Sequence, residues 1–224
     1  VTISCAYTKL PVKIGGTDPG ISAELNGGTH MSLEDMALMR AIANMVVFEP
    51  TDAEQFSQAI PQIAYNDSPT YIRIQRTAAD KVYGPDYRFQ LGKADVLRDG
   101  KDVVIFCSGI MVIRSLAAAE ILAEQGIDAA VVNVHTLKPL DEETVLKYAA
   151  KCRAVVTAEN HSIIGALGGA VAEVLAEKCP TVMRRIGVTD HFGEVGKLDY
   201  LEKKFHMTPS DIADAAKSAV AAKN

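Results

Sequence analysis

The stretch of this chain best suited to chemistry is GGTHMSLED at positions 27–35. Its two glycines lack a Cβ and let the backbone approach a neighbour closely. Ser32 is a favourable N-cap for a helix expected over residues 33–42, and the two acids that follow suit the positive end of that helix. We therefore expect His30 on a loop just outside a helix N-terminus, where an imidazole can exchange a proton with a ligand near neutral pH. A histidine that bonds only the nearby backbone fits the same pattern.

The second part of the chain alternates short strands with helices. Apolar, β-branched runs, typical of strands buried on both faces of a parallel sheet, recur at 103–106, 130–134, 154–157 and 181–183. Helical patterns lie between or after them, at 111–125, 141–150, 166–178 and 209–222. Thr208-Pro209 supplies an N-cap and a first helical residue for the last of these. This alternation predicts right-handed βαβ units in a parallel sheet.

The first part has elements of the same class but fewer of them. We expect strands at 12–14, 45–48 and 71–74 and helices at 33–42 and 53–64. These are too few to cover a parallel sheet on both faces. Gly84-Pro85-Asp86 interrupts any regular element, so we divide the chain into domains at residues 1–84 and 85–224.

Composition excludes several classes of partner. The net charge of −5 argues against nucleic acid and anionic membranes, and no apolar run is long enough for a membrane span. The cysteines are far apart, with no C-x-x-C pair, so we expect neither a disulfide nor a metal site and favour a reduced, cytoplasmic setting.

From Val12 to about Arg76 the chain resembles the pyrimidine-binding domain of transketolase-type thiamine diphosphate enzymes. The motifs that carry this resemblance are GGTH at 27–30, ED at 34–35 with Arg40, PTD at 50–52 and PTYIR at 69–73. From about residue 92 to the end it resembles the C-terminal domain of the same family, on GKA at 92–94, SG at 108–109 and ENH at 159–161. The match is best to the separate C-terminal subunit of split bacterial transketolases, and we interpret the chain as N-terminally incomplete.

The resemblance implies an α/β fold: a truncated pyrimidine-binding domain followed by a C-terminal domain with a mainly parallel five-stranded sheet. It also implies an enzyme that moves a two-carbon ketol unit from a ketose to an aldose, in carbohydrate metabolism such as the pentose phosphate pathway. The cofactors would be thiamine diphosphate and Mg²⁺. A second, N-terminal polypeptide would hold the metal and the diphosphate, because this chain lacks a G-D-G motif followed by a distant Asn. We expect the chain to form a homodimer and to be inactive without that partner.

Three residues become candidates for the substrate site by the same resemblance. His30 matches the histidine that faces the reactive carbon and bonds the donor oxygens, and we take it as catalytic. Arg76 matches the arginine at the phosphate end of the sugar, and Asn26 stands where an aspartate commonly bonds a substrate hydroxyl. Asp18 replaces a common phosphate-binding histidine, so the substrate can be a sugar phosphate or an unphosphorylated ketose. A surface pair between Arg76 and Asp80 is the alternative for that arginine.

No residue is assigned to the cofactor itself. The family's catalytic glutamate and the aromatics that stack on the pyrimidine ring correspond to positions before Val1. We assign no metal ligand in this chain either.

The remaining charged residues have structural interpretations. We expect Arg73 and the acids at 34–35 to stabilise the fold, and Arg40 to pair across a subunit interface. Glu159, His161 and the glycine-rich 165–169 segment suggest an anion site at a helix start, with close packing at a dimer interface as the better explanation. We expect the other histidines on loops or the surface, at positions 135, 191 and 206.

Two other functions fit the same sequence. One is the β subunit of a 2-oxoacid dehydrogenase, which shares the fold. The other is a non-catalytic dimerisation module. The donor that is used, a ketose or pyruvate, separates the two enzymes.

Overall fold

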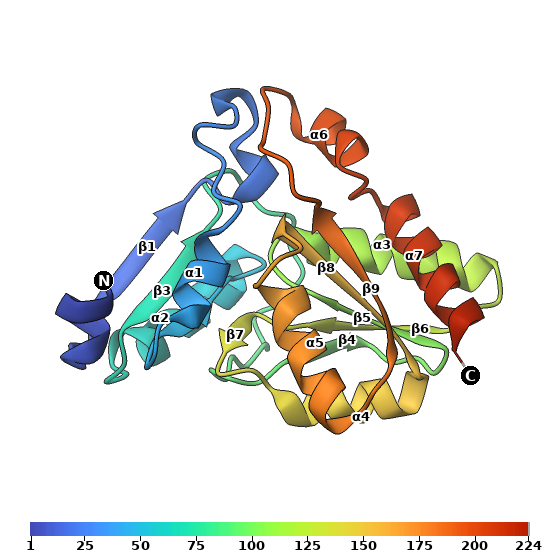
Figure 1. The fold of residues 1–224 in the computed structure, drawn as a ribbon, viewed down its shortest axis with the longest axis horizontal. Coiled ribbons are helices and arrows are strands. Elements are labelled where there is room, and N and C mark those ends of the chain that lie inside the picture. The colour runs from blue at the N-terminus through green and yellow to red at the C-terminus, as the bar shows by residue number, and fades with distance from the viewer. Residues whose placement is uncertain (224) are drawn as a thin grey trace.

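Two mainly parallel sheets form the frame of the molecule (Figure 1), in a computed structural model that describes residues 1–223. The first has the strand order β1-β3-β2-β7 and the second β4-β6-β5-β8-β9. The predicted α/β fold, with a five-stranded sheet in the second part, is confirmed.

The five-stranded sheet is the core of the second part. Its strands are β4 (Asp95–Arg98), β5 (Val103–Cys107), β6 (Ala129–Asn133), β8 (Ala154–Ser162) and β9 (Val182–Val188). Strands β5 and β6 are buried along their whole length, as apolar runs in a parallel sheet should be. Strand β4 was not predicted; it is half-exposed and pairs antiparallel to β6 at the sheet edge.

Helices cover both faces of this sheet. Helices α3 (Met111–Glu124) and α7 (Pro209–Ala222) pack on one face, and α4 (Glu142–Cys152) and α5 (Leu167–Lys178) pack on the other. The side chains of β5 alternate between these two cores: Ile105 joins the α3 side and Phe106 the α4 side. All four helices were predicted to within two residues at each end, whereas the short α6 (Leu198–Lys204) was not predicted.

The four-stranded sheet carries the candidate chemistry. Its strands are β1 (Lys13–Thr17), β2 (Val46–Phe48), β3 (Thr70–Ile74) and β7 (Thr136–Lys138). Helices α1 (Asp35–Ala41) and α2 (Ala53–Ala64) accompany it, with a π-helical turn η1 (Thr2–Tyr7) and a 3₁₀ segment η2 (Gly20–Asn26). None of β7, η1 and η2 was expected from the sequence.

Strand β7 comes from the second part of the chain but pairs antiparallel with β2 of the first, with Val47 opposite Lys138. In Figure 1 it lies where the two parts meet. Between β3 and β4 the chain has no helix or strand, which matches the interruption predicted at Gly84-Pro85-Asp86. The division after residue 84 stays a prediction.

Asp52 explains the PTD motif at 50–52. One carboxylate oxygen accepts the backbone N–H of Gln55 at 2.8 Å and caps α2. The other accepts the N–H groups of Val82 and Tyr83, both at 2.8 Å. One side chain therefore begins a helix and also holds the connection to the second part.

The expected cap on α1 is wrong. The helix begins at Asp35, and Glu34 is its N-cap residue. The side chain of Glu34 makes no capping hydrogen bond, and the Ser32 hydroxyl does not bond the helix N-terminus either. The carbonyl of Ser32 instead accepts the N–H of Gly20 at 2.9 Å, because Ser32 forms a bridge with Pro19. Within residues 1–223, no helix is long and apolar enough to cross a membrane.

Candidate functional site

The carboxyl ends of β1 and β3 bring the predicted substrate residues together. The two strands run parallel and in register as far as Thr17 and Ile74. Asp18 follows the first directly and Arg76 follows the second by two residues. The Arg76 Nε lies 3.0 Å from an Asp18 carboxylate oxygen, so the expected alternative pair with Asp80 is wrong.

Asn26 completes this group. With its amide oxygen assigned toward the guanidinium, it accepts from the two terminal nitrogens of Arg76 at 3.3 and 3.2 Å. We refer to Asp18, Asn26 and Arg76 as the arginine cluster. Its arginine side chain is 56% exposed, so its remaining N–H groups can still meet a ligand.

His30 lies exposed on the turn that precedes α1. Its Nδ1 is 2.9 Å from the Thr29 hydroxyl, and its backbone N–H bonds the Gly27 carbonyl at 3.0 Å. When the hydroxyl donates to Nδ1, the proton of the neutral ring lies on Nε2, which is then a hydrogen-bond donor. The ring is therefore available to an oxygen of a substrate.

The two glycines before His30 lie close against a neighbouring backbone segment, as expected of residues that lack a Cβ. A Cβ on Gly28 would lie 2.2 Å from the Gly193 carbonyl oxygen, and one on Gly27, whose φ is +75°, would lie 2.8 Å from a methyl of Val195. The turn is thus packed against the segment that follows β9 in the second part of the chain.

A buried ion-pair network lies beneath the site. Arg73 is 1% exposed and donates to Glu49 at 2.7 Å, to Asp35 at 2.9 Å and to the Ser32 carbonyl at 2.8 Å. Tyr71 donates to the same carboxylate of Asp35 at 2.7 Å. The predicted structural role of Arg73 is confirmed, and it reaches the backbone just after His30.

Asp35 does more than stabilise the start of α1. Burial alone would raise the pKa of its carboxyl, but the charge and the hydrogen bond of Arg73 hold that pKa below its ordinary value. Asp35 is therefore a charged partner inside the network rather than only a helix-terminal acid.

The second part of the chain closes this network from the other side. The Ser108 hydroxyl donates to Glu49 at 2.5 Å, and a Cβ on Gly109, whose φ is +52°, would lie 2.7 Å from the carboxyl carbon of Glu49. Both residues of the SG motif at 108–109 therefore contact the carboxylate of Glu49, which belongs to the first part.

Arg40 pairs within the chain, whereas its pairing across a subunit interface stays a prediction. Its guanidinium bonds both carboxylate oxygens of Glu173 on α5, at 2.8 and 2.6 Å, and the Gly165 carbonyl at 2.7 Å.

The anion site that the sequence suggested at the start of α5 is not free, while the favoured explanation, packing at a dimer interface, stays a prediction. The carboxylate of Glu159 already accepts the N–H groups of Leu167 and Gly168, each at 2.8 Å. Burial raises the pKa of Glu159 to about 7, with a further contribution from Glu49 that the two backbone donors oppose. The chain's own carboxylate therefore occupies this helix terminus.

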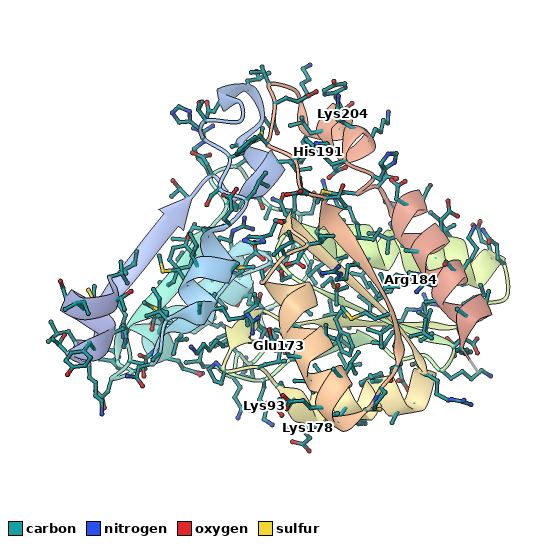
Figure 2. The ribbon with its side chains drawn as sticks, viewed as in Figure 1. Lys93, Glu173, Lys178, Arg184, His191 and Lys204 are labelled. Carbon is teal, nitrogen blue, oxygen red and sulfur yellow. The ribbon has the colours of Figure 1, made fainter. Side chains whose placement is uncertain are left out.

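The remaining histidines divide into two kinds. His135, expected on a loop or the surface, is fully buried beside Thr136 and Asp95, and burial lowers its pKa to about 4. His161 is buried too, 3.7 Å from Asp35, and burial again lowers the pKa to about 4. His191, in the loop between β9 and α6 (Figure 2), and His206 are exposed as predicted.

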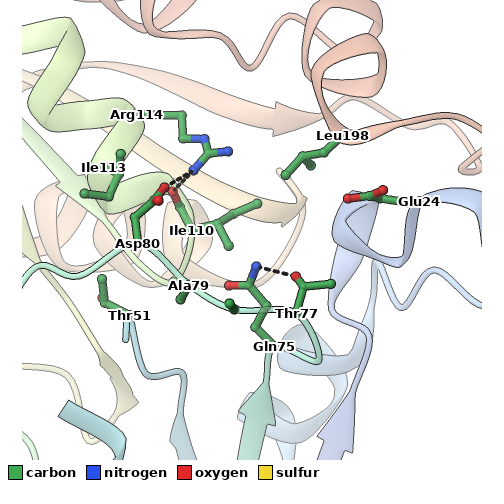
Figure 3. Close-up of a pocket in the computed structure, with 12 residues that line it drawn as sticks. Glu24, Thr51, Gln75, Thr77, Ala79, Asp80, Ile110, Ile113, Arg114 and Leu198 are labelled. Carbon is green, nitrogen blue, oxygen red and sulfur yellow. Dashed lines mark hydrogen bonds and ion pairs between the residues drawn. The ribbon is translucent and has the colours of Figure 1, made fainter. Parts of the chain in front are cut away.

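A cavity of about 260 Å³ is lined by Gln75 and Thr77, the chain neighbours of Arg76 (Figure 3). It lies between Glu24 of η2, residues 75 and 77–80 after β3, and the start of α3. Asp80 and Arg114, which both line it, lie 3.8 Å apart on one side of it. His30, Asn26 and Arg76 do not line this cavity. Within residues 1–223, no three acidic, histidine or cysteine side chains are grouped as a metal site would require.

Comparisons with known proteins agree with this architecture. Residues 2–81 match the model of the transketolase pyrimidine-binding domain, and residues 92–212 match the model of the transketolase C-terminal domain. A solved structure described as a split-gene transketolase, inactive beta4 tetramer, superposes with a TM-score of 0.93 at 43% identity, over the whole of this chain and 71% of that one.

Two curated relatives are subunits of named enzymes. The 6-deoxy-6-sulfo-D-fructose transketolase subunit of Clostridium sp. (strain MSTE9) is 55% identical over the whole of this chain and 70% of its own length. A subunit of the apulose-4-phosphate transketolase of Phocaeicola vulgatus is 37% identical over 85% of this chain and 61% of its own length. The pentose phosphate pathway finds no support in these names.

The raised pKa of Glu159 predicts a pH-dependent effect of Glu159→Gln. A folded-state pKa of about 7 lies above the ordinary value of 4.5, so between these pH values the folded protein holds a proton that the unfolded chain has released. The stabilisation that protonation gives is therefore lost as pH rises to 7. Because glutamine does not titrate, the unfolding free energy of wild type should fall by about 2 kcal/mol relative to that of the variant from pH 5 to pH 8.

Denaturant titrations at several pH values would measure this difference. Glu120→Gln, at an exposed carboxylate on α3, should show a constant difference across the same range. A constant difference for Glu159→Gln would contradict the assignment.

Proposed function

Because the chain belongs to the transketolase family, as the C-terminal part of a split transketolase, we propose that it takes part in the transfer of a two-carbon ketol unit from a ketose to an aldose. The observation that carries this proposal is the arginine cluster beside the turn of His30. A second polypeptide completes the enzyme and holds Mg²⁺ and the diphosphate of the cofactor. Thiamine diphosphate supplies the carbon–carbon bond chemistry when bound.

The residues of this chain fit the substrate end of such a site. His30 offers an exposed ring nitrogen, and its Nε2–H donates to the donor oxygens where negative charge develops. Arg76 binds the far end of the sugar, and Asn26 bonds a hydroxyl along it.

The far end of the donor is a sulfonate in this proposal. Asp18 lies 3.0 Å from the guanidinium of Arg76, so the two charges nearly cancel where the terminal group would bind. A dianionic phosphate meets more repulsion from this carboxylate than a monoanionic sulfonate does. The name of the 55% identical relative, which specifies 6-deoxy-6-sulfo-D-fructose, supports the same choice.

The chain also offers an apolar surface for a second copy of itself. It is a hollow of about 390 Å³ between α1, the end of β8 with the loop after it, and the loop after β9. Three large apolar side chains on it are well exposed: Leu38 at 65%, Ile164 at 59% and Phe192 at 87%. Exposed groups of this kind mark contact surfaces. The description of the related split-gene protein as a beta4 tetramer supports self-association.

The activity is tested by combining the chain with a diphosphate-binding transketolase subunit, thiamine diphosphate and Mg²⁺. We expect transfer from 6-deoxy-6-sulfo-D-fructose to an aldose acceptor, slower transfer from D-fructose 6-phosphate, and none when either polypeptide is omitted. Product formation followed by mass spectrometry measures this.

Other outcomes decide between the alternatives. Turnover by this chain alone would contradict the need for a partner. Decarboxylation of pyruvate without ketol transfer would favour a 2-oxoacid dehydrogenase. A stable complex that turns over no donor would favour a dimerisation module.

Asp18→Asn should shift donor preference toward phosphate. Removing this carboxylate leaves Arg76 as a net positive charge, so kcat/KM for D-fructose 6-phosphate relative to the sulfonated ketose should rise about tenfold. Asp99→Asn, which removes an exposed carboxylate paired with Lys151, is the control and should leave the ratio unchanged. An unchanged ratio in Asp18→Asn would remove Asp18 from donor selection.

Phe192→Asp should weaken self-association. A charge at this 87% exposed aromatic would have to be desolvated in an apolar contact, so the dimer dissociation constant should rise at least tenfold. Tyr65→Asp, at an equally exposed aromatic that follows α2, is the matched control. Sedimentation or light scattering over a range of concentrations measures the change, and equal behaviour of both variants would place the interface elsewhere.

A further inference from the structure

We propose that Asn160, in the second part of the chain, is a positioning residue that fixes the segment Asp18–Asn26 for the donor sugar. This inference rests on the proposed function, because that segment carries two members of the arginine cluster. It gives the C-terminal part of the chain a role in binding the donor, although it contributes no side chain to the cluster.

The hydrogen bonds of Asn160 all reach one turn. Asn160 lies on β8 and is 1% exposed. Its amide oxygen accepts the N–H of Ile21 at 2.9 Å, and its amide nitrogen donates to the Pro19 carbonyl at 2.9 Å and to the Ser22 hydroxyl at 3.4 Å. The side chain of Asn160 therefore bonds one backbone N–H, one backbone carbonyl and one hydroxyl of a turn from the first part of the chain.

Gly20 allows this contact. Its φ is +53°, and a Cβ there would lie 2.2 Å from the carbonyl oxygen of Asn160 and 2.3 Å from its side-chain oxygen. The backbone of the turn thus lies directly on β8, with no room for a larger residue. This close packing leaves the backbone of the turn no freedom to shift toward β8.

The turn at Pro19–Ser22 lies in the chain between two members of the arginine cluster. Asp18 lies just before it, and η2 leads from it to Asn26. The opposite member, Arg76, extends from β3, whose Arg73 also bonds the Ser32 carbonyl. That carbonyl accepts the Gly20 N–H as well, at 2.9 Å. The two sides of the cluster are therefore held in place relative to one another through the turn that Asn160 bonds.

A residue that only joined the two parts would affect stability without affecting the donor. Asn133 on β6 supplies the matched comparison. It is fully buried and also joins the two parts, since its amide nitrogen donates to the Thr51 hydroxyl at 2.9 Å and to Tyr83 at 2.8 Å. It makes no hydrogen bond to residues 18–26.

The test compares Asn160→Ala, Asn160→Asp and Asn133→Ala. The first readout is hydrogen exchange of the chain without partner or cofactor. Exchange in residues 18–26 should become about tenfold faster in Asn160→Ala, because the buried hydrogen bonds that hold the turn against β8 are lost. Asn160→Asp keeps the acceptor for Ile21 but buries a carboxylate against the Pro19 carbonyl, so exchange in residues 18–26 should be at least as fast as in Asn160→Ala. Asn133→Ala should not change exchange there.

The second readout is kinetic, in the two-subunit assembly. Asn160→Ala should raise the donor KM about tenfold while kcat stays within about twofold, whereas Asn133→Ala should leave the donor KM unchanged. Unchanged exchange in residues 18–26, or faster exchange with an unchanged donor KM, would overturn the inference. If the wild-type assembly transferred no ketol unit, the proposed function would fail, and the exchange result would still decide whether Asn160 holds the turn.

Discussion

The buried guanidinium of Arg73 is the constraint on which the rest of the structure depends. A charge taken out of water is tolerated only when opposite charges and hydrogen bonds surround it. Glu49 and Asp35 supply the charges, and the Ser32 carbonyl takes a further N–H. These partners come from different elements, so satisfying one side chain fixes α1, the end of β2 and the turn after His30 together.

The same requirement joins the two parts of the chain. Glu49 also accepts the hydroxyl of Ser108, at the end of β5, and Gly109 leaves the space that its carboxylate needs. Glu159 adds a second buried carboxylate nearby, which satisfies the start of α5. The bond from Ser108 to Glu49 thus crosses the junction between the two parts, and the packing of Gly109 against the same carboxylate fixes how the parts meet.

Sequence reasoning succeeded where a signal is local. Apolar β-branched runs located β5, β6 and β8, and helical spacing located α2 and α7. It failed where a partner is distant: β7 is a three-residue strand only because β2 lies beside it, and His135 is buried because Phe48 and Phe89 pack around it. For the site, the motifs selected His30, Asn26 and Arg76. That Asp18 pairs with Arg76, and that Arg40 and Glu159 bond within the chain, depends on loop paths that no local pattern encodes.

The placement of β7 has a consequence for how the protein folds. The sheet that bears the site is completed by residues 136–138, which follow the first three strands of the five-stranded sheet in the chain. During synthesis from the N-terminus, the first part must therefore wait, with one side of β2 unpaired, until much of the second part has emerged. The two sheets are in this sense a single cooperative unit, and the substrate loops reach their final positions only when both are in place.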